Sequence, residues 1–101
     1  MVKTIYKYVI PFRGGEVSVQ IPKDAVLLKS GFQVVVTTPI LCVWALVDPN
    51  AEKEERRFRI HETGHTLPDD SVAVGAAIGE FEYWETLIER DFVWHIFVSV
   101  S

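Results

Sequence analysis

The stretch Arg59-Ile60-His61-Glu62-Thr63-Gly64-His65 contains the pattern H-E-x-x-H, the pattern in this chain with the best-defined chemistry. In zinc metalloproteases, two histidines four residues apart share one face of a helix and bind the ion, and the glutamate acts as general base. The pattern carries that chemistry only where the segment is helical.

The neighbouring residues predict a strand and not a helix. The large apolar residues here are Phe58 and Ile60, two positions apart, whereas a packed helix needs apolar residues three and four apart. On a strand, histidines four apart are separated by about 13 Å, too far to share an ion with bonds of ~2.0–2.1 Å. We therefore predict a strand over residues 56–61 with Phe58 and Ile60 facing inward. The protease match is then accidental, and no metal site and no catalytic residue is expected.

An arginine cluster follows a run of glutamates. Arg56, Arg57 and Arg59 carry guanidinium forks that can grip a phosphate or a carboxylate group. Three glutamates lie between positions 52 and 55, so partial self-neutralisation across a charged hairpin is the alternative interpretation.

Four further residues complete the candidate binding set. His65 with Asp69 and Asp70 could form an acid–base pair, although a loop histidine held by a neighbouring carboxylate or carbonyl is the plainer interpretation. His95 could join this pair if the final strand lies alongside, but its alternation with Trp94 and Ile96 predicts an ordinary outward-facing strand histidine. Tyr83 and Trp84 offer aromatic rings of the kind that dominate binding surfaces. The chain has three tryptophans, three tyrosines and six phenylalanines, more than one small core hides easily. Exposed aromatic surface, and with it a partner or a homo-oligomer, is expected.

Composition limits the class of protein. With 101 residues there is room for a single domain over residues 1–101. The net charge of −4 argues against direct nucleic-acid or membrane binding. Cys42 is the single cysteine, so no internal disulfide forms and a cytoplasmic location fits. It lies in the most apolar stretch of the chain, which predicts a buried thiol.

The elements that position these residues are predicted to be strands. Alternation, β-branching and turn residues favour a mainly β fold, an antiparallel sandwich or small barrel of about seven strands. The expected strands cover residues 4–10, 16–21, 25–28, 32–37, 40–47, 56–61, 80–84 and 92–100. A turn is expected at Ser30-Gly31, and one short helical turn is an alternative for residues 86–90. The segment 72–78 is ambiguous.

Three stretches resemble a known group of proteins. They are KTIYKY at residues 3–8, LCVWALVDP at residues 41–49, and RRFRI at residues 56–60 leading to TGHTLPD at residues 63–69. Together they resemble a family of short bacteriophage and prophage proteins of unknown function, in which the Thr-Gly-His turn is the characteristic element. The resemblance implies an accessory protein made in the host bacterial cytoplasm, and it brings no catalytic role and no cofactor.

Three functions are compatible with these residues. The first is a non-catalytic interaction module acting on a host or phage protein, as in host takeover or anti-defence. The second is a small-ligand or nucleotide-binding protein in which the arginine cluster holds phosphate, Tyr83 or Trp84 stacks the base and His65 donates a hydrogen bond. The third is a hydrolase using His65 and Asp69.

Overall fold

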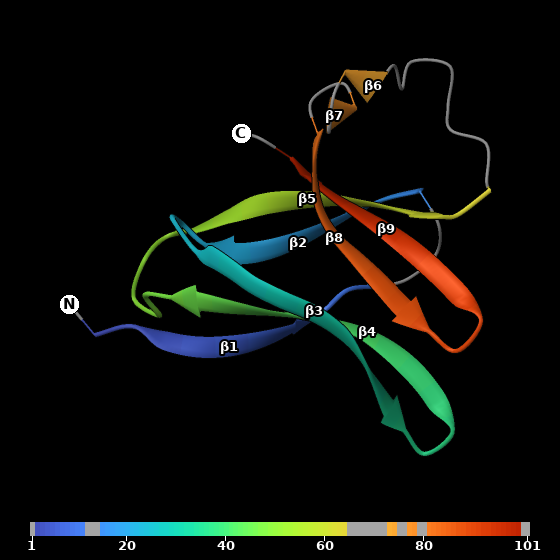
Figure 1. Ribbon diagram of the computed structural model, residues 1–101. Coiled ribbons are helices and arrows are strands. Elements are labelled where there is room, and N and C mark those ends of the chain that lie inside the picture. Colours follow the sequence, from blue (N-terminus) through green and yellow to red (C-terminus); the bar gives the residue numbers. More distant parts are fainter. Residues whose placement is uncertain (1, 12–14, 65–72, 75–76, 79–80, 100–101) are drawn as a thin grey trace. The chain divides into compact units, whose positions relative to one another are not determined.

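The structure is a computed structural model that describes residues 2–11, 15–64, 73–74, 77–78 and 81–99. Within these ranges it is all β, which confirms the predicted class (Figure 1). The strands are β1 (Thr4–Val9), β2 (Gly15–Pro22), β3 (Val26–Val35), β4 (Thr38–Val47), β5 (Lys53–Glu62), β6 (Ala73–Val74), β7 (Ala77–Ile78), β8 (Phe81–Glu89) and β9 (Phe92–Ser99). In the described part of the chain no helix is long and apolar enough to cross a membrane.

The strands form two sheets. One has three strands in the order β1-β4-β3, and the other has six in the order β2-β5-β9-β8-β7-β6. All the recorded pairings are antiparallel. Neither order closes on itself over the described strands, so the small barrel is excluded and two open sheets, the components of a sandwich, remain. The count exceeds the predicted seven because the ambiguous segment contains the two-residue strands β6 and β7.

The chain divides into two compact units. The first consists of residues 1–12 and 18–56, and the second of residues 13–17 and 57–101. Strands β2 and β5 each contribute residues to both units. The single domain expected from the chain length stays a prediction.

The first unit is built around β4, the middle strand of its sheet. Leu41, Val43, Ala45 and Val47 alternate along β4 and are at most 2% exposed. They lie on one face of the sheet because successive strand residues point to opposite sides. Cys42 is 1% exposed, which confirms the predicted buried thiol.

The prediction of two strands separated by a turn at Ser30-Gly31 is wrong, because β3 runs unbroken through both residues. Gly31 has a packing role instead: a Cβ atom on it would stand 3.4 Å from the Trp44 ring. Ser30 is 2% exposed, so it too is an interior strand residue. The irregularity in β3 is a bulge between Leu27 and Lys29.

The turn between β3 and β4 contains an unusual backbone conformation. Val36 has φ = 60° and its side chain is 93% exposed. Glycine or asparagine normally occupies such a position, because a β-branched residue meets steric strain at positive φ. Val36 therefore strains this hairpin turn, whereas a glycine at the same position would adopt the conformation without strain.

The second unit is centred on β5, β9 and β8. Phe58 pairs with Val98 and Ile60 with Ile96, and all four side chains are buried, so the predicted inward face of β5 is confirmed. The backbone is extended through His61, because β5 ends only at Glu62.

The helical turn considered for residues 86–90 is wrong. Strand β8 continues to Glu89 and the chain reverses at Arg90 and Asp91. Arg90 has φ = 57°, a left-handed backbone conformation that allows the chain to reverse tightly. Thr86, which pairs with His95, is thereby kept in the sheet.

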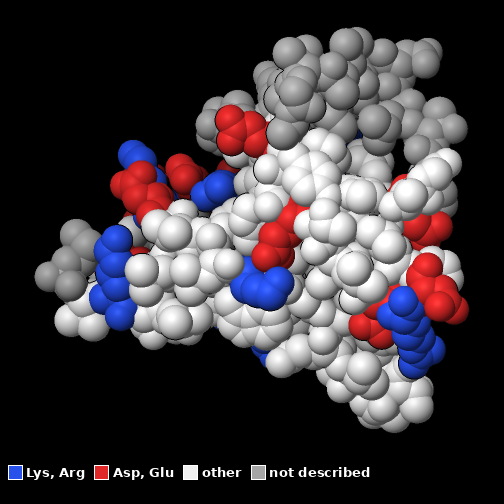
Figure 2. Space-filling model, viewed as in Figure 1, with Lys and Arg blue, Asp and Glu red and all other residues white. Residues whose placement is uncertain are grey.

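Charged side chains of both signs lie beside one another on the surface. Figure 2 shows basic and acidic residues in mixed groups separated by broad uncharged areas.

Candidate functional site

Side chains that can bind a ligand gather on one face of the second unit's sheet. Arg57, Arg59 and His61 alternate with the buried Phe58 and Ile60, so they point to the opposite face of β5. All three are half-buried, not fully exposed as an outward-facing residue would be. Neighbouring strands add rings to this face, because paired residues of antiparallel strands share a side.

The pairings fix which rings these are. His61 pairs with His95, and Arg59 pairs with Phe97, on β9. Phe97 pairs in turn with Tyr83 on β8. Cations from β5 and rings from β9 and β8 thus meet on one surface.

Two guanidinium groups pack on one phenylalanine. The Cζ atoms of Arg57 and Arg59 lie 5.2 and 5.4 Å from the centroid of the Phe81 ring, within the range of cation–π attraction. Arg57 also lies 3.8 Å from a carboxylate oxygen of Glu16. Arg59 Nε is buried and makes no hydrogen bond within the described part of the chain.

His95 is held at both ring nitrogens. Its Nδ1 lies 2.7 Å from the Tyr83 hydroxyl, and its Nε2 lies 2.6 Å from Thr63 Oγ1. The Tyr83 hydroxyl also contacts Thr86 Oγ1 closely, and Thr63 Oγ1 lies 3.4 Å from the carbonyl oxygen of Val93.

Two proton orders satisfy these contacts when His95 is neutral. In one, Thr86 donates to Tyr83, Tyr83 to His95 Nδ1, His95 Nε2–H to Thr63, and Thr63 to the carbonyl oxygen of Val93. In the other, Thr63 donates to His95 Nε2, His95 Nδ1–H to Tyr83 and Tyr83 to Thr86, while the carbonyl oxygen of Val93 accepts the backbone N–H of Thr63. In both orders each ring nitrogen of His95 has a hydroxyl partner, so the ring is held in one position.

A bulge makes this chain possible. Tyr83 and Thr86 are three residues apart, and a regular strand would place them on opposite faces. The register of β8 shifts between Tyr83 and Glu85, so that Tyr83 pairs with Phe97 and Thr86 with His95. Both hydroxyls consequently face His95.

The surface is hollowed at this point. A shallow depression of about 230 Å³, which we term the His95 hollow, is lined by His61, Glu62, Thr63, Gly64, Tyr83, His95 and Phe97. The Tyr83 and Phe97 rings meet edge to face with centroids 5.0 Å apart, and the His61 ring meets Phe97 at 6.0 Å. The hollow therefore has an aromatic floor and a polar rim. Its volume is below the ~300–1,000 Å³ typical of small-molecule sites and suits a single inserted side chain.

The predicted site residues do not all lie at one site. Arg57, Arg59 and Tyr83 lie on the surface just described. Arg56 is in the first unit, where its Nη1 donates to the carbonyl oxygen of Ala25 at 3.5 Å, so the three arginines do not form one clamp. Trp84 is half-buried at the β8 bulge. The predictions for His65 and Asp69 fall outside the described residues.

Sequence reasoning missed the centre of the site. His95 was expected to be an ordinary outward strand histidine, and Phe81, Phe97 and Thr63 were given no binding role. Alternation over residues 92–100 already places His95 and Phe97 on one face. The missing information was the register between β5 and β9, which no local pattern encodes.

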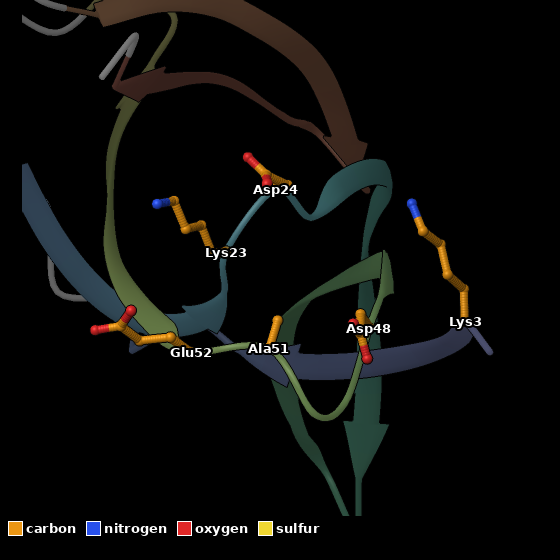
Figure 3. Close-up of a pocket in the computed structure, with 6 residues that line it drawn as sticks. All are labelled: Lys3, Lys23, Asp24, Asp48, Ala51 and Glu52. Atoms are coloured by element: carbon orange, nitrogen blue, oxygen red, sulfur yellow. The ribbon is translucent and has the colours of Figure 1, made fainter. Parts of the chain in front are cut away.

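A second depression lies in the first unit. It measures about 310 Å³ and is lined by Lys3, Lys23, Asp24, Asp48, Ala51 and Glu52. Figure 3 shows its charged groups pointing in different directions and not toward a common point. The backbone N–H of Lys23 donates to the carbonyl of Glu52 at 2.7 Å, and that of Asn50 donates to Asp48 Oδ1 at 3.0 Å. These residues thus shape adjoining turns, and the His95 hollow is the better candidate site.

No group of three or more histidine, cysteine, aspartate or glutamate side chains suitable for holding a metal ion occurs among the residues whose positions are described. The extended course of β5 through His61 also differs from the helix on which the zinc-protease pattern depends.

Comparison with known proteins assigns the family. The chain matches Domain of unknown function (DUF7352) over residues 1–101, so it belongs to this family. None of the curated proteins and none of the solved structures that were compared matches it.

Proposed function

We propose that this protein is a non-catalytic interaction module that binds a protein partner through the His95 hollow and the adjoining arginines. The resemblance in its three sequence stretches supports a phage-type accessory protein acting on a host or phage protein in the bacterial cytoplasm, in host takeover or anti-defence. The proposed partner inserts one side chain into the hollow and presents carbonyl or carboxylate oxygens to Arg57 and Arg59.

The observation that carries this proposal is the way in which His95 is held. Both ring nitrogens of His95 are held by hydroxyl groups, Nε2 by that of Thr63 and Nδ1 by that of Tyr83. A ring fixed in this way can form a rigid wall of a recognition surface, because rigid rings lose little conformational entropy on binding.

The arginines support the same conclusion. Packing on Phe81 fixes the planes of both guanidinium groups. Pre-positioned forks of this kind favour carboxylate and carbonyl acceptors.

Affinity capture with matched variants tests the proposal. The immobilised protein is compared with Arg59→Met, which keeps the packing on Phe81 and removes the charge, and with Arg59→Lys, which keeps the charge and removes the fork. Arg90→Met is the control, because Arg90 is exposed on the β8–β9 turn. A partner from infected-host lysate that is retained by the wild type and by Arg90→Met, and lost by both Arg59 variants, is the expected result.

Two results would contradict it. Equal retention by the Arg59 variants and the wild type would remove the site from the interaction. Heat released with one member of a nucleotide panel in titration calorimetry, and abolished by Arg59→Met, would identify the protein as a small-ligand binder. Aromatic rings and arginines lie on the same surface, and this combination is the reason for testing small-ligand binding as a second function.

A further inference from the structure

The exposed face of the first unit's sheet carries an unusual set of side chains. Residues paired across antiparallel strands lie on the same side, so the register assembles two rows around β4. One row is Ile5–Leu46–Val26 and the next is Lys7–Trp44–Lys29. We term this side of the sheet the Trp44 face.

Large apolar groups on the Trp44 face remain in contact with solvent. Ile5 is 58% exposed and Val26 is 51% exposed, while Leu46 and Trp44 are half-buried. Contiguous apolar surface of this kind marks interaction sites in soluble proteins.

Gly31 allows Trp44 to lie along the sheet. The ring approaches to 3.4 Å from the point where a Cβ atom of Gly31 would stand, so any larger residue there would press on the ring. The indole therefore forms a flat platform across β4 and β3. Aromatic platforms of this type are frequent centres of binding energy.

The charge of this face is opposite to that of the whole chain. Lys7 and Lys29 are both exposed and flank Trp44 on the two neighbouring strands. Strands β1, β3 and β4 contain no aspartate or glutamate, although the chain has 14 acidic residues. Two strand spacings place the lysine Cα atoms about 10 Å apart.

From this arrangement we infer that the Trp44 face is a docking surface for an acidic polypeptide segment, in which an apolar side chain is flanked by carboxylates. The apolar side chain lies on Trp44 and the aliphatic row, and the carboxylates pair with Lys7 and Lys29. This surface lies in the first unit, and the inference does not depend on the His95 hollow.

Charge and composition argue against other occupants. A second copy bound through the same face would bring its lysines against these lysines. An anionic membrane usually recruits clusters of about four to eight basic residues, and the net charge of −4 opposes it. Nucleic acid gains little from the aliphatic row, since bases stack on aromatic rings.

The test uses two synthetic peptides of equal length as probes. One has leucine and phenylalanine flanked by glutamates, and the other has lysines in place of the glutamates. Binding is followed by titration calorimetry and by peptide-dependent changes in the NMR amide spectrum. The glutamate peptide is expected to bind and to shift resonances of β1, β3 and β4, while the lysine peptide does not bind.

Matched variants distinguish binding at the Trp44 face from a general effect of net charge. Lys7→Glu combined with Lys29→Glu is expected to weaken binding of the glutamate peptide about tenfold or more. Lys23→Glu combined with Lys53→Glu changes the net charge equally at exposed positions outside β1, β3 and β4 and is expected to change the affinity by less than about threefold. Trp44→Leu, whose folding is checked by circular dichroism, is expected to lose about tenfold or more.

Several outcomes would overturn the inference. They are failure of the glutamate peptide to bind, equal losses in the two lysine pairs, or preferential binding to a single-stranded oligonucleotide or to phosphatidylglycerol vesicles. Self-association in sedimentation that is abolished by Trp44→Leu would point to a second copy instead. Arg59→Met leaves peptide binding unchanged if the two surfaces are independent, so failure here and failure of the His95 hollow are distinguishable.

Discussion

At the scale of single residues, His95 is a titratable side chain whose ring is held in one position by hydrogen bonds to its neighbours. Its Nδ1 and Nε2 bond to two hydroxyls from different segments, that of Tyr83 on β8 and that of Thr63 in the turn after β5. The proton order in this chain is complete only when each hydroxyl is present. Removing one group therefore leaves a neighbour without its partner, and this cost can be measured.

Replacing Tyr83 by phenylalanine is predicted to lower the free energy of unfolding by about 0.5–1.5 kcal/mol. The change removes the hydroxyl that bonds to both His95 Nδ1 and Thr86 Oγ1, while the ring stays on Phe97. Urea unfolding followed by circular dichroism measures the loss. Thr86→Val, which removes only the terminal hydroxyl of the chain, is the control and is expected to cost less. Equal stability of Tyr83→Phe and the wild type would show that the chain is not formed.

Tyr8 predicts a loss of stability at alkaline pH. Burial, and secondarily the neighbouring Tyr6, raises the pKa of the Tyr8 hydroxyl above its ordinary value. The folded protein thus holds this proton more tightly than the unfolded chain. The resulting contribution to stability is complete below about pH 10, the unfolded pKa, and is lost as the pH rises through the higher folded pKa.

Urea midpoints measured across the alkaline range test this expectation. Tyr8→Phe is expected to decline less steeply with pH than the wild type. Tyr6→Phe removes only the smaller cause and is expected to retain most of the decline. A Tyr8→Phe curve parallel to that of the wild type would contradict the prediction.

At the scale of elements, the β3–β4 hairpin carries strain in its turn. Val36→Gly is predicted to raise the free energy of unfolding by about 0.5–1 kcal/mol, because glycine adopts φ = 60° without steric cost. Val34→Gly is the matched control, since Val34 is 60% exposed on the adjoining strand and there glycine costs about 0.5–1 kcal/mol. Urea unfolding of both variants should give opposite signs. A destabilising Val36→Gly would show that the turn is not strained.

Elements with clean alternation were predictable from sequence, and those shaped by a distant contact were not. Strand β4 follows from β-branching, and the part of β5 from Arg56 onward follows from Phe58 and Ile60. The first three residues of β5, 53–55, were expected to belong to a charged loop, and that expectation is wrong. The continuity of β3 does not, because Ser30-Gly31 has the composition of a turn and only the Trp44 ring explains the glycine. The extent of β8 was missed for a similar reason: its bulge and its end at Arg90 depend on pairing with β9.

The candidate site was predictable only as separate parts. Arg57, Arg59 and Tyr83 were identified from residue type alone. Their association with His95 depends on the registers of three strands, and a shift by one residue would place every partner on the opposite face. Arg56, adjacent in sequence to Arg57, contacts Ala25 instead because neighbouring strand residues point to opposite sides.

At the scale of the whole molecule, two compact units share two strands. Residues of β2 and of β5 belong to both units, so loss of either strand disrupts both. We predict a single cooperative unfolding transition. Trp44 reports on the first unit, and Trp84 and Trp94 report on the second.

Fluorescence of tryptophan variants measures this cooperativity. The protein that retains only Trp44 and the protein with Trp44→Phe are expected to show urea midpoints that coincide with their own circular dichroism midpoints. Midpoints that differ between the fluorescence and the circular dichroism of one variant would demonstrate independent units.

The buried thiol of β4 has a practical consequence. Cys42 is the single cysteine, and its Sγ lies 3.6 Å from the carbonyl oxygen of Ile40 and 4.0 Å from Gln33 Oε1. At 1% exposure, a thiol reagent reaches it only after the central strand separates from a neighbour. The rate at which Cys42 of the unmodified protein is labelled therefore measures spontaneous opening of that sheet. A ligand that binds the sheet and holds its strands together will lower this rate.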